Sequence, residues 1–218
     1  LYLLGAAALL PWGTPLAGVD VWRFFGHDIV PAPLRNGEGM AAFTDWLHIV
    51  LVDQALPGVL ATVQLTMIAL VATGLIAFAC FPLVSPLFLG RFGRLGGHIV
   101  LVVLRSTPEY LLAYMLLQLW GPSMLPAIVA LALHNGAIIG HLTGRFSETI
   151  ALRADTPRGI DRYAFEVLPR IYRQTLALLF YRWEVILRET AILGMLGIAT
   201  LGFYIDSAFA DIRYDRAM

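Results

Sequence analysis

Four charged residues stand close together near the C-terminal end of the sequence, beside an apolar stretch. Arg182, Glu184, Arg188 and Glu189 directly precede residues 190–205, which contain no Asp, Glu, Arg or Lys. At membrane depth each ionisable group costs at least about 2.5–3.5 kcal/mol on insertion scales, so such groups usually pair or face a cavity. Guanidinium groups bind oxyanions through paired hydrogen bonds. These residue types therefore indicate either structural ion pairs or a polar lining along which an anion passes.

The spacing of the four charges predicts which of them share a helix face. Glu184 and Arg188 are four apart with the acid first, which is the favourable order for an ion pair on a helix. Arg182 and Glu189 are seven apart and share the opposite face, about 10 Å apart by the rise of a helix. Both hypotheses stay open: ion pairs that lock helix packing, or a lining for a translocation path.

A second pair of charges flanks a proline. Arg105 and Glu109 lie on either side of Pro108. Proline removes one backbone donor and can kink a helix, so a movable element at this point is plausible. Arg105 either extends to the lipid head groups or lines the inner mouth of a path together with Glu109.

Two histidines and three glycines mark another helix. His134 and His141 are seven apart, too far for one metal ion to be reached readily by both, so we predict packed or interfacial histidines and no metal site. Gly136, Gly140 and Gly144 form a ridge of small residues, which is typical of close helix packing in membranes.

Composition excludes several protein classes. The 218 residues are 59% hydrophobic and 14% charged, with a mean hydropathy of +0.75, whereas soluble domains are about 45–50% apolar and about 25% charged. The formal net charge is zero, which argues against nucleic-acid binding. All 15 basic residues are Arg, so the lysine of an ATP-binding phosphate loop is missing. The single cysteine, Cys80, excludes an internal disulfide framework.

Long charge-free runs predict an all-α, multi-pass transmembrane helical bundle. A bilayer core needs about 20 predominantly apolar residues per helix, and lipid admits only helices or closed barrels. The runs lack the short alternation of barrel strands. Charge-free segments and turn residues place the helices at about 1–17, 57–81, 98–120, 124–142 and 174–203.

The ends of the chain and the charges of its loops predict that the chain is divided into two parts. Residues 1–56 are expected to hold a truncated N-terminal transmembrane helix and an extracytoplasmic segment, and residues 57–218 a transmembrane core that lacks its last helix. The connection at 143–173 carries six of the 15 Arg. Arg91 and Arg94 lie in the loop between the helices expected at 57–81 and 98–120. The positive-inside rule places both loops in the cytoplasm and segment 18–56 outside.

Ordered motifs in residues 57–216 resemble a known family. Residues 104–109 (LRSTPE) resemble the entry of a core helix in permease subunits of ABC importers. Residues 151–154 (ALRA), followed by Val167, Leu168 and Pro169, resemble the EAA loop of that family. Residues 181–184 (YRWE), Arg188 and residues 193–197 (LGMLG) are similar to phosphonate-importer permeases in particular. The resemblance implies the MetI-like core of a type I ABC importer permease.

The resemblance also implies roles for residues. The EAA loop, at about 145–173 here, forms a coupling helix that sits in a cleft of the ATPase subunit. The corresponding residues are Ala151, Leu152, Arg153, Ala154, Asp155 and Thr156, with Gly159, Leu168 and Pro169 after them. Here Ile150 replaces the usual opening Glu, and Thr156 the usual Gly. The candidate translocation residues are Arg105, Glu109, Arg182, Glu184, Arg188 and Glu189.

As a permease, the chain would have no catalytic residue and no cofactor of its own, since ATP and Mg would be bound by a partner ATPase. The implied partners are a second permease, two ATPases, an extracytoplasmic binding protein and the lipid of the bacterial inner membrane, with no nucleic acid. The expected cargo is a small anion, phosphonate or a related phosphorus oxyanion. The alternatives are a permease for another small solute, an intramembrane enzyme acting on a lipid or peptide, and, ranked lowest, a secondary transporter.

Overall fold

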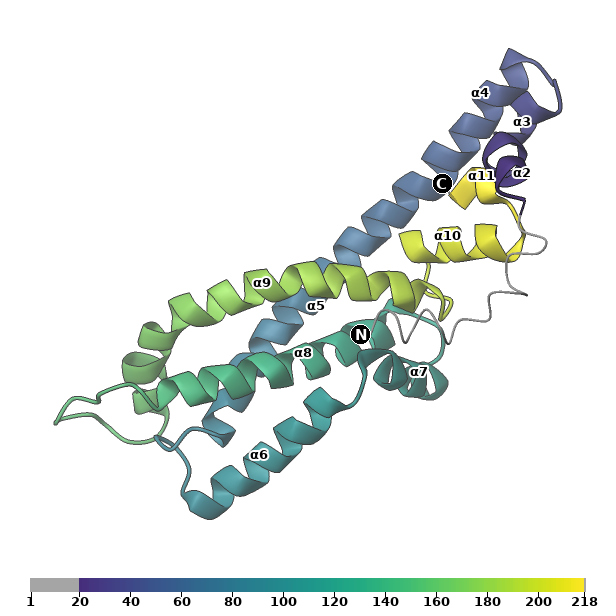
Figure 1. The fold of residues 1–218 in the computed structure, drawn as a ribbon. Coiled ribbons are helices and arrows are strands. Elements are labelled where there is room, and N and C mark those ends of the chain that lie inside the picture. Colours follow the sequence, from purple (N-terminus) through teal and green to yellow (C-terminus); the bar gives the residue numbers. More distant parts are fainter. Residues whose placement is uncertain (1–19, 218) are drawn as a thin grey trace, which may run out of the picture.

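The computed structural model describes residues 20–217, and this part of the chain contains helices and no strands (Figure 1). The all-α prediction is confirmed, while the helix expected at 1–17 lies outside the described residues. In chain order the elements are α2 Val21–Arg23, η1 Phe24–Asp28, α3 Ala32–Arg35, α4 Met40–His48, η2 Ile49–Ala55, α5 Leu56–Cys80, η3 Phe81–Leu83, α6 Arg91–Ser106, α7 Glu109–Trp120, α8 Met124–Ser147, η4 Arg162–Val167, α9 Leu168–Gly194, α10 Leu201–Ala210 and α11 Tyr214–Ala217.

The helix predicted at 57–81 is present as α5, but it continues a helical segment that begins earlier, at Met40. Elements α4, η2, α5 and η3 form one helical stretch of 44 residues, Met40–Leu83. Residues 40–55, which we expected in a segment outside the membrane, are therefore helical. At 1.5 Å per residue the stretch is about 66 Å long, roughly twice the hydrocarbon core of a bilayer. Its first part, with Asp45, His48 and Asp53, can project beyond the lipid.

The single helix predicted at 98–120 is wrong. The chain forms two helices, α6 and α7, that meet at an angle of 89°. Thr107 takes an extended conformation, and Pro108 begins the new direction. Because proline cannot donate a backbone hydrogen bond and clashes with the preceding turn, the helix breaks rather than bends gently.

Helix α8 lies at the centre of the bundle. It packs along α5, and most of its residues from Pro126 to Gly144 are buried. The glycine ridge permits this approach: a side chain at Gly136 would lie 2.6 Å from Ile76, and one at Gly140 would lie 3.2 Å from the Ala77 carbonyl oxygen. The helix ends at Ser147 and not at 142 as predicted, because close packing against the end of α5 continues through Gly144.

Gly144→Ala is expected to destabilise the protein. A Cβ at this position would meet the Val84 side chain and lie 2.9 Å from the Phe81 carbonyl oxygen, whose backbone cannot easily move. Overpacking of this kind costs about 1–3 kcal/mol, which should lower the midpoint of thermal unfolding in detergent. Gly96→Ala is the matched control, since nothing lies within 4 Å of a Cβ there. Equal midpoints for the two variants would contradict this packing.

The last predicted helix, 174–203, also differs from the structure. Helix α9 begins at Leu168, with Pro169 in its first turn, and ends at Gly194. The chain then turns at Gly197, which has a φ of +85°, and continues as α10. Gly202 packs against the Ala191 backbone, an approach that leaves no room for a side chain. The glycines therefore fold the chain back instead of extending the helix.

Short helices cluster at one end of the molecule, and the connections α5–α6 and α8–α9 lie at the other (Figure 1). At the end with the short helices, Asp215 accepts a 3.2 Å hydrogen bond from the Ala32 amide. The aromatic rings of Phe24 and Tyr214 also pack there, with their centroids 5.5 Å apart. Burial would raise the pKa of Asp215, but hydrogen bonds from Arg213 and Ala32 outweigh it and lower that pKa. The carboxylate therefore stays ionised, so it links the two ends of the described chain.

Among residues 20–217, two helices are long and apolar enough to cross a membrane, Met40–Leu83 and Met124–Ser147. The bent pair α6 and α7 gives a third if it counts as one span. Helix α9 does not meet this criterion, although we expected a span there. It carries six charged residues, Arg170, Arg173, Arg182, Glu184, Arg188 and Glu189.

Candidate functional site

A cluster of polar side chains lies where α7, α8 and α9 meet. His134 on α8 is buried, and its Nδ1 donates a 2.9 Å hydrogen bond to the carbonyl oxygen of Thr107. That carbonyl lies at the break between α6 and α7, where Pro108 interrupts the helical ladder. The other ring nitrogen, Nε2, lies 3.7 Å from Glu109 Oε2. His134 thus links the broken helix to the centre of the bundle.

Asn135, the next residue on α8, joins α8 to α9. It is fully buried, and its Nδ2 donates to the Leu131 carbonyl oxygen at 3.0 Å and to Glu189 Oε2 at 3.1 Å. Its Oδ1 accepts a hydrogen bond from Arg182 Nε. Arg182 also lies 3.7 Å from Glu189 through its Nη2, so the three side chains form a closed network. We call Glu109, His134, Asn135, Arg182 and Glu189 the central polar cluster.

The charges of this cluster limit what it can bind. Two carboxylates and one guanidinium leave a net charge of −1 while His134 is neutral. Arg182 and Glu189 are 21% and 11% exposed, and each already has a partner. A buried pair is stable only when its remaining hydrogen bonds are satisfied, and Asn135 supplies these. The cluster is therefore suited to holding three helices in register rather than to receiving an anion unaided.

The six residues proposed for translocation separate into two groups. Glu109, Arg182 and Glu189 come together in the central polar cluster, and the pairing of Arg182 with Glu189 is closer than the helix rise suggests because both side chains reach Asn135. Arg105 lies exposed near the end of α6. Glu184 and Arg188 form the expected pair at 2.9 Å, but they are 69% and 70% exposed on the outside of α9.

The connection between α8 and α9 has a different conformation from the one expected. Residues 150–159 contain turns and no helix, so the coupling helix implied at 151–156 is not formed in this chain. Pro157 interrupts any helix there, and Gly159 has a φ of +73° that favours a turn. The helical part of the connection begins at Ile160, just before η4. We call residues 148–167 the coupling segment.

Two charged residues hold the start of the coupling segment against α9. Arg170 donates a 2.7 Å hydrogen bond from Nη1 to the Ala151 carbonyl oxygen and pairs through Nη2 with Glu166. Glu166 is buried and accepts a hydrogen bond from the Arg153 amide at 3.4 Å. Sequence reasoning missed both residues. The four-residue spacing of Glu166 and Arg170, which favours an ion pair on one helix, was the available signal.

Further contacts fix the second half of the coupling segment to the end of α5. Arg162 donates from Nη1 to the Leu87 carbonyl oxygen at 2.8 Å and from Nε to the Pro157 carbonyl oxygen at 3.0 Å. The Tyr163 hydroxyl donates to the Phe78 carbonyl oxygen at 3.0 Å, and burial raises the pKa of this hydroxyl, so it remains a neutral donor. These contacts attach the segment to α5 and to the α5–α6 connection.

The candidate coupling residues differ in exposure. Ala151, Arg153, Ala154, Asp155, Gly159 and Pro169 are exposed, whereas Thr156 and Leu168 are half-buried. Leu152 packs with Ile150 against the core cluster around Phe81. Two apolar side chains that were not among the candidates are exposed instead: Ile160 is 79% and Phe165 is 77% exposed. These two could contact a partner.

Glu166→Gln is expected to loosen the coupling segment without unfolding the bundle. The neutral amide keeps the volume but loses the ion pair with Arg170. Removing a charge-assisted hydrogen bond costs about 1.5–3 kcal/mol locally, so amide hydrogen exchange at residues 151–156 should accelerate about 10- to 100-fold. Exchange in α8 serves as the internal control and should stay unchanged. Equal exchange at 151–156 in both proteins would show that Glu166 does not hold the segment.

Within residues 20–217, no group of three or more His, Cys, Asp and Glu residues is arranged to hold a metal ion.

Comparison with known proteins finds two curated relatives and one solved structure of similar fold. No family model matches the chain. It is 28% identical over 218 residues to the phosphate-import permease protein PhnE of Mycolicibacterium smegmatis, an alignment that covers 92% of this chain and 39% of that protein. It is 26% identical over 125 residues to the phosphite transport system permease protein PtxC of Stutzerimonas stutzeri, with 55% of this chain and 46% of that protein covered. The chain thus spans less than half the length of these curated relatives.

Among solved structures, the chain is similar to a crystal structure of an amino acid ABC transporter with histidines. The TM-score is 0.61 at 18% identity, and the match covers 82% of this chain and 86% of the other. This likeness concerns the fold alone. The predicted resemblance is thereby confirmed: the chain is a helical membrane protein with the fold of an ABC transporter permease, and its curated relatives are permeases of phosphate and phosphite import, which are transport components and not enzymes.

Proposed function

We propose that this chain is the membrane-spanning permease subunit of an ABC importer and that it lines a path for a small phosphorus oxyanion. Its curated relatives import phosphate and phosphite, which share a small, tetrahedral, anionic phosphorus group. Transport would be driven by separate ATPase subunits that bind ATP and Mg. The proposal assigns this chain no catalytic residue.

One observation carries the proposal: the exposed ion pair on α9. Glu184 and Arg188 belong to a stripe of exposed residues spaced three or four apart, Gln174, Ala177, Tyr181, Glu184, Arg188 and Ala191. Charged and amide side chains do not face lipid, because no water is available there to solvate them. The stripe therefore requires another protein surface or a water-filled path beside it. A second permease packed opposite α9 would supply both.

The exposed pair suits transient binding of an oxyanion. The Arg188 guanidinium can donate two parallel hydrogen bonds to an oxyanion, and Glu184 at 2.9 Å competes for the same donors. Competition keeps binding weak, which a path requires if the anion is to leave again. The central polar cluster behind this stripe would hold α9 in place and would not itself bind cargo.

The coupling segment is proposed as the contact with the ATPase subunits. Its exposed surface combines Arg153 and Asp155 with the apolar side chains of Ile160 and Phe165. Apolar anchors surrounded by charged residues are typical of transient protein interfaces. Two such segments, one in each permease, would engage two ATPases.

The proposed orientation follows from the distribution of Arg. The coupling segment and the α5–α6 connection would lie in the cytoplasm of a bacterial inner membrane. The opposite end, with α2, α3 and α11, would then face an extracytoplasmic substrate-binding protein (Figure 1).

ATP-driven uptake into proteoliposomes tests the proposal. The complete transporter, with its ATPase and binding protein, should accumulate phosphate, phosphite or methylphosphonate and should not accumulate histidine. Arg188→Gln is expected to reduce uptake at least about tenfold, the effect of losing one charge-assisted hydrogen bond. Arg173→Gln removes an exposed charge from the same helix outside the stripe, and uptake should stay close to normal. Uptake of histidine without any of the oxyanions would contradict the proposed cargo, and normal uptake by Arg188→Gln would contradict the proposed path.

A further inference from the structure

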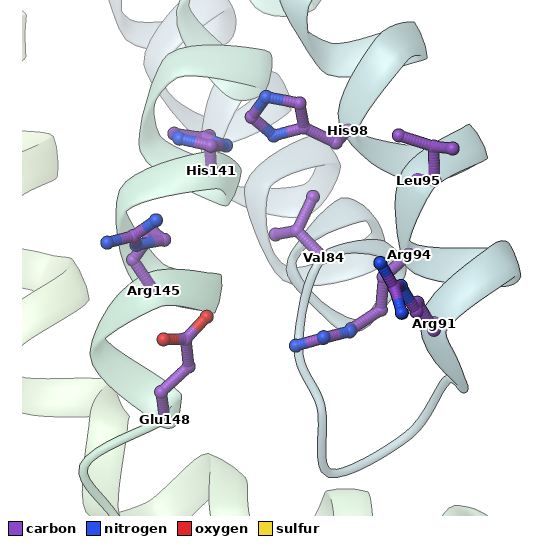
Figure 2. A pocket seen from close by; sticks show the side chains of 8 residues that line it. All are labelled: Val84, Arg91, Arg94, Leu95, His98, His141, Arg145 and Glu148. Atoms are coloured by element: carbon purple, nitrogen blue, oxygen red, sulfur yellow. The ribbon is translucent and has the colours of Figure 1, made fainter.

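An open pocket of about 330 Å³ lies between α6 and α8, at the end of the bundle that carries the coupling segment (Figure 2). Two helix faces form its walls. Its lining residues are Arg91, Arg94, Leu95 and His98 on α6, His141, Arg145 and Glu148 at the end of α8, and Val84 from the α5–α6 connection. The lining positions recur at 91, 94–95 and 98 on α6 and at 141, 145 and 148 along α8, so each wall is a continuous face of its helix. The pocket shares no residue with the central polar cluster or with the exposed stripe of α9.

The pocket concentrates positive charge. Three guanidinium groups and one carboxylate line it, which gives a net charge of +2 with neutral histidines. In the described part of the chain, Arg91, Arg94 and Arg145 take part in none of the ion pairs. Like charges held together repel, so a bound counter-ion would stabilise this arrangement.

Two histidines from opposite walls of the pocket lie close to each other. The rings of His98 and His141 lie 5.1 Å apart, one on each wall (Figure 2). The Nδ1 atom of His141 is buried and has no hydrogen-bond partner among the described residues. Buried polar atoms are nearly always hydrogen-bonded, so this nitrogen is available to a group bound in the pocket. This observation is independent of the arginine cluster.

We propose that this pocket binds a phosphate-bearing anion. Guanidinium groups match the geometry of phosphate oxygens, and a basic pocket between transmembrane helices on the cytoplasmic side suits a phosphate head group. Leu95 and Val84 add an apolar side to the polar one, and the volume admits a group the size of a head group. The phosphate belongs either to an anionic phospholipid or to a free phosphorus oxyanion. The inference does not depend on which cargo the permease transports.

Binding to the purified transporter tests the proposal with two probes. The complete permease–ATPase complex is placed in phosphatidylcholine nanodiscs without binding protein or nucleotide. Inorganic phosphate is titrated by calorimetry, and retention of phosphatidylglycerol from mixed nanodiscs is measured by native mass spectrometry. At about 1 kcal/mol per arginine, affinity for the bound probe should fall about fivefold with each of Arg91→Gln, Arg94→Gln and Arg145→Gln. Response to phosphate alone would identify a free anion, and response to phosphatidylglycerol alone would identify a lipid.

Two further variants separate a pocket from general attraction to positive charge. Leu95→Trp fills the pocket without changing any charge, and the position is 57% exposed, so the larger side chain need not disturb the core. It should abolish binding of the same probe. Arg173→Gln removes an exposed charge outside the pocket and should leave affinity within about twofold, as expected for a screened surface charge. Failure of the wild-type complex to bind either probe, or unchanged binding by Leu95→Trp, would overturn the proposal.

Discussion

Arg182→Gln is expected to give a permease that is severely destabilised or cannot be recovered folded. The substitution leaves Glu189 charged and buried at the contact between α8 and α9, with only the Asn135 amide as partner. Breaking a buried ion pair by removing one member costs about 3–5 kcal/mol. We expect a large fall in the thermal unfolding midpoint of the detergent-solubilised complex, and loss of uptake as a consequence.

The double variant Arg182→Gln and Glu189→Gln distinguishes a structural role of the two charges from a role in transport. It removes both charges together, while amide groups at both positions can still hydrogen-bond to Asn135. Replacing both members of a buried pair is often nearly neutral, so most of the lost stability should return. If the cluster only positions α9, uptake should return as well. A double variant as unstable as the single one would contradict the pairing, and a stable double variant without uptake would place these charges in the path itself.

Asp155→Arg is expected to uncouple ATP hydrolysis from transport. Asp155 is exposed in the coupling segment and forms no ion pair among the described residues, so the reversal should leave the fold intact. At an interface, a like-charge contact costs several kcal/mol, which corresponds to at least about a tenfold loss of ATPase binding. Co-purification of the ATPase and substrate-stimulated ATP hydrolysis are the measurements.

The control for this prediction is Asp45→Arg, an equal charge change at an exposed position. Asp45 lies near the start of the helical stretch Met40–Leu83, at the end of the molecule away from the coupling segment (Figure 1). It should leave co-purification of the ATPase unchanged. Normal co-purification and normal stimulated hydrolysis by Asp155→Arg would show that Asp155 does not lie at the interface with the ATPase.

Composition was sufficient for the positions of the central helices. The charge-free runs predicted α5 to within one residue at each end and α8 at its start, because long apolar segments in a membrane protein have few alternatives to a helix. The glycine ridge on α8 was also interpreted correctly. Its close contact with α5 follows from the absence of side chains at Gly136, Gly140 and Gly144.

Helix breaks were harder to predict. Pro108 was recognised as a possible kink, but at the 89° turn the Thr107 carbonyl oxygen accepts a hydrogen bond from His134, which lies 27 positions away in sequence and could not be foreseen locally. The end of α9 depends similarly on the close packing of Gly202 against Ala191. A proline or glycine permits such a break, whereas tertiary contacts decide how sharp it is.

The candidate site was predicted in part. Charges on α9 drew attention to Arg182 and Glu189, but nothing in the local sequence indicated that Asn135 would lie between them. The resemblance predicted where the coupling segment lies. It also implied a helix at 151–156, and Pro157 with Gly159 gives turns there instead. Glu166 and Arg170 support this irregular segment in place of helical hydrogen bonds.

Single-cysteine labelling and crosslinking at residue 154 tests the central claim most directly. Ala154 is exposed in the coupling segment, and Cys80 is the only native cysteine, so Cys80→Ala with Ala154→Cys gives one reactive thiol. In sealed vesicles, a membrane-impermeant maleimide should label this thiol only from the cytoplasmic side, and a short bifunctional reagent should join it to the ATPase subunit. Ala41→Cys in the same background should be labelled only from the other side. Labelling of residue 154 from outside, or no crosslink to an ATPase in the assembled transporter, would contradict the account.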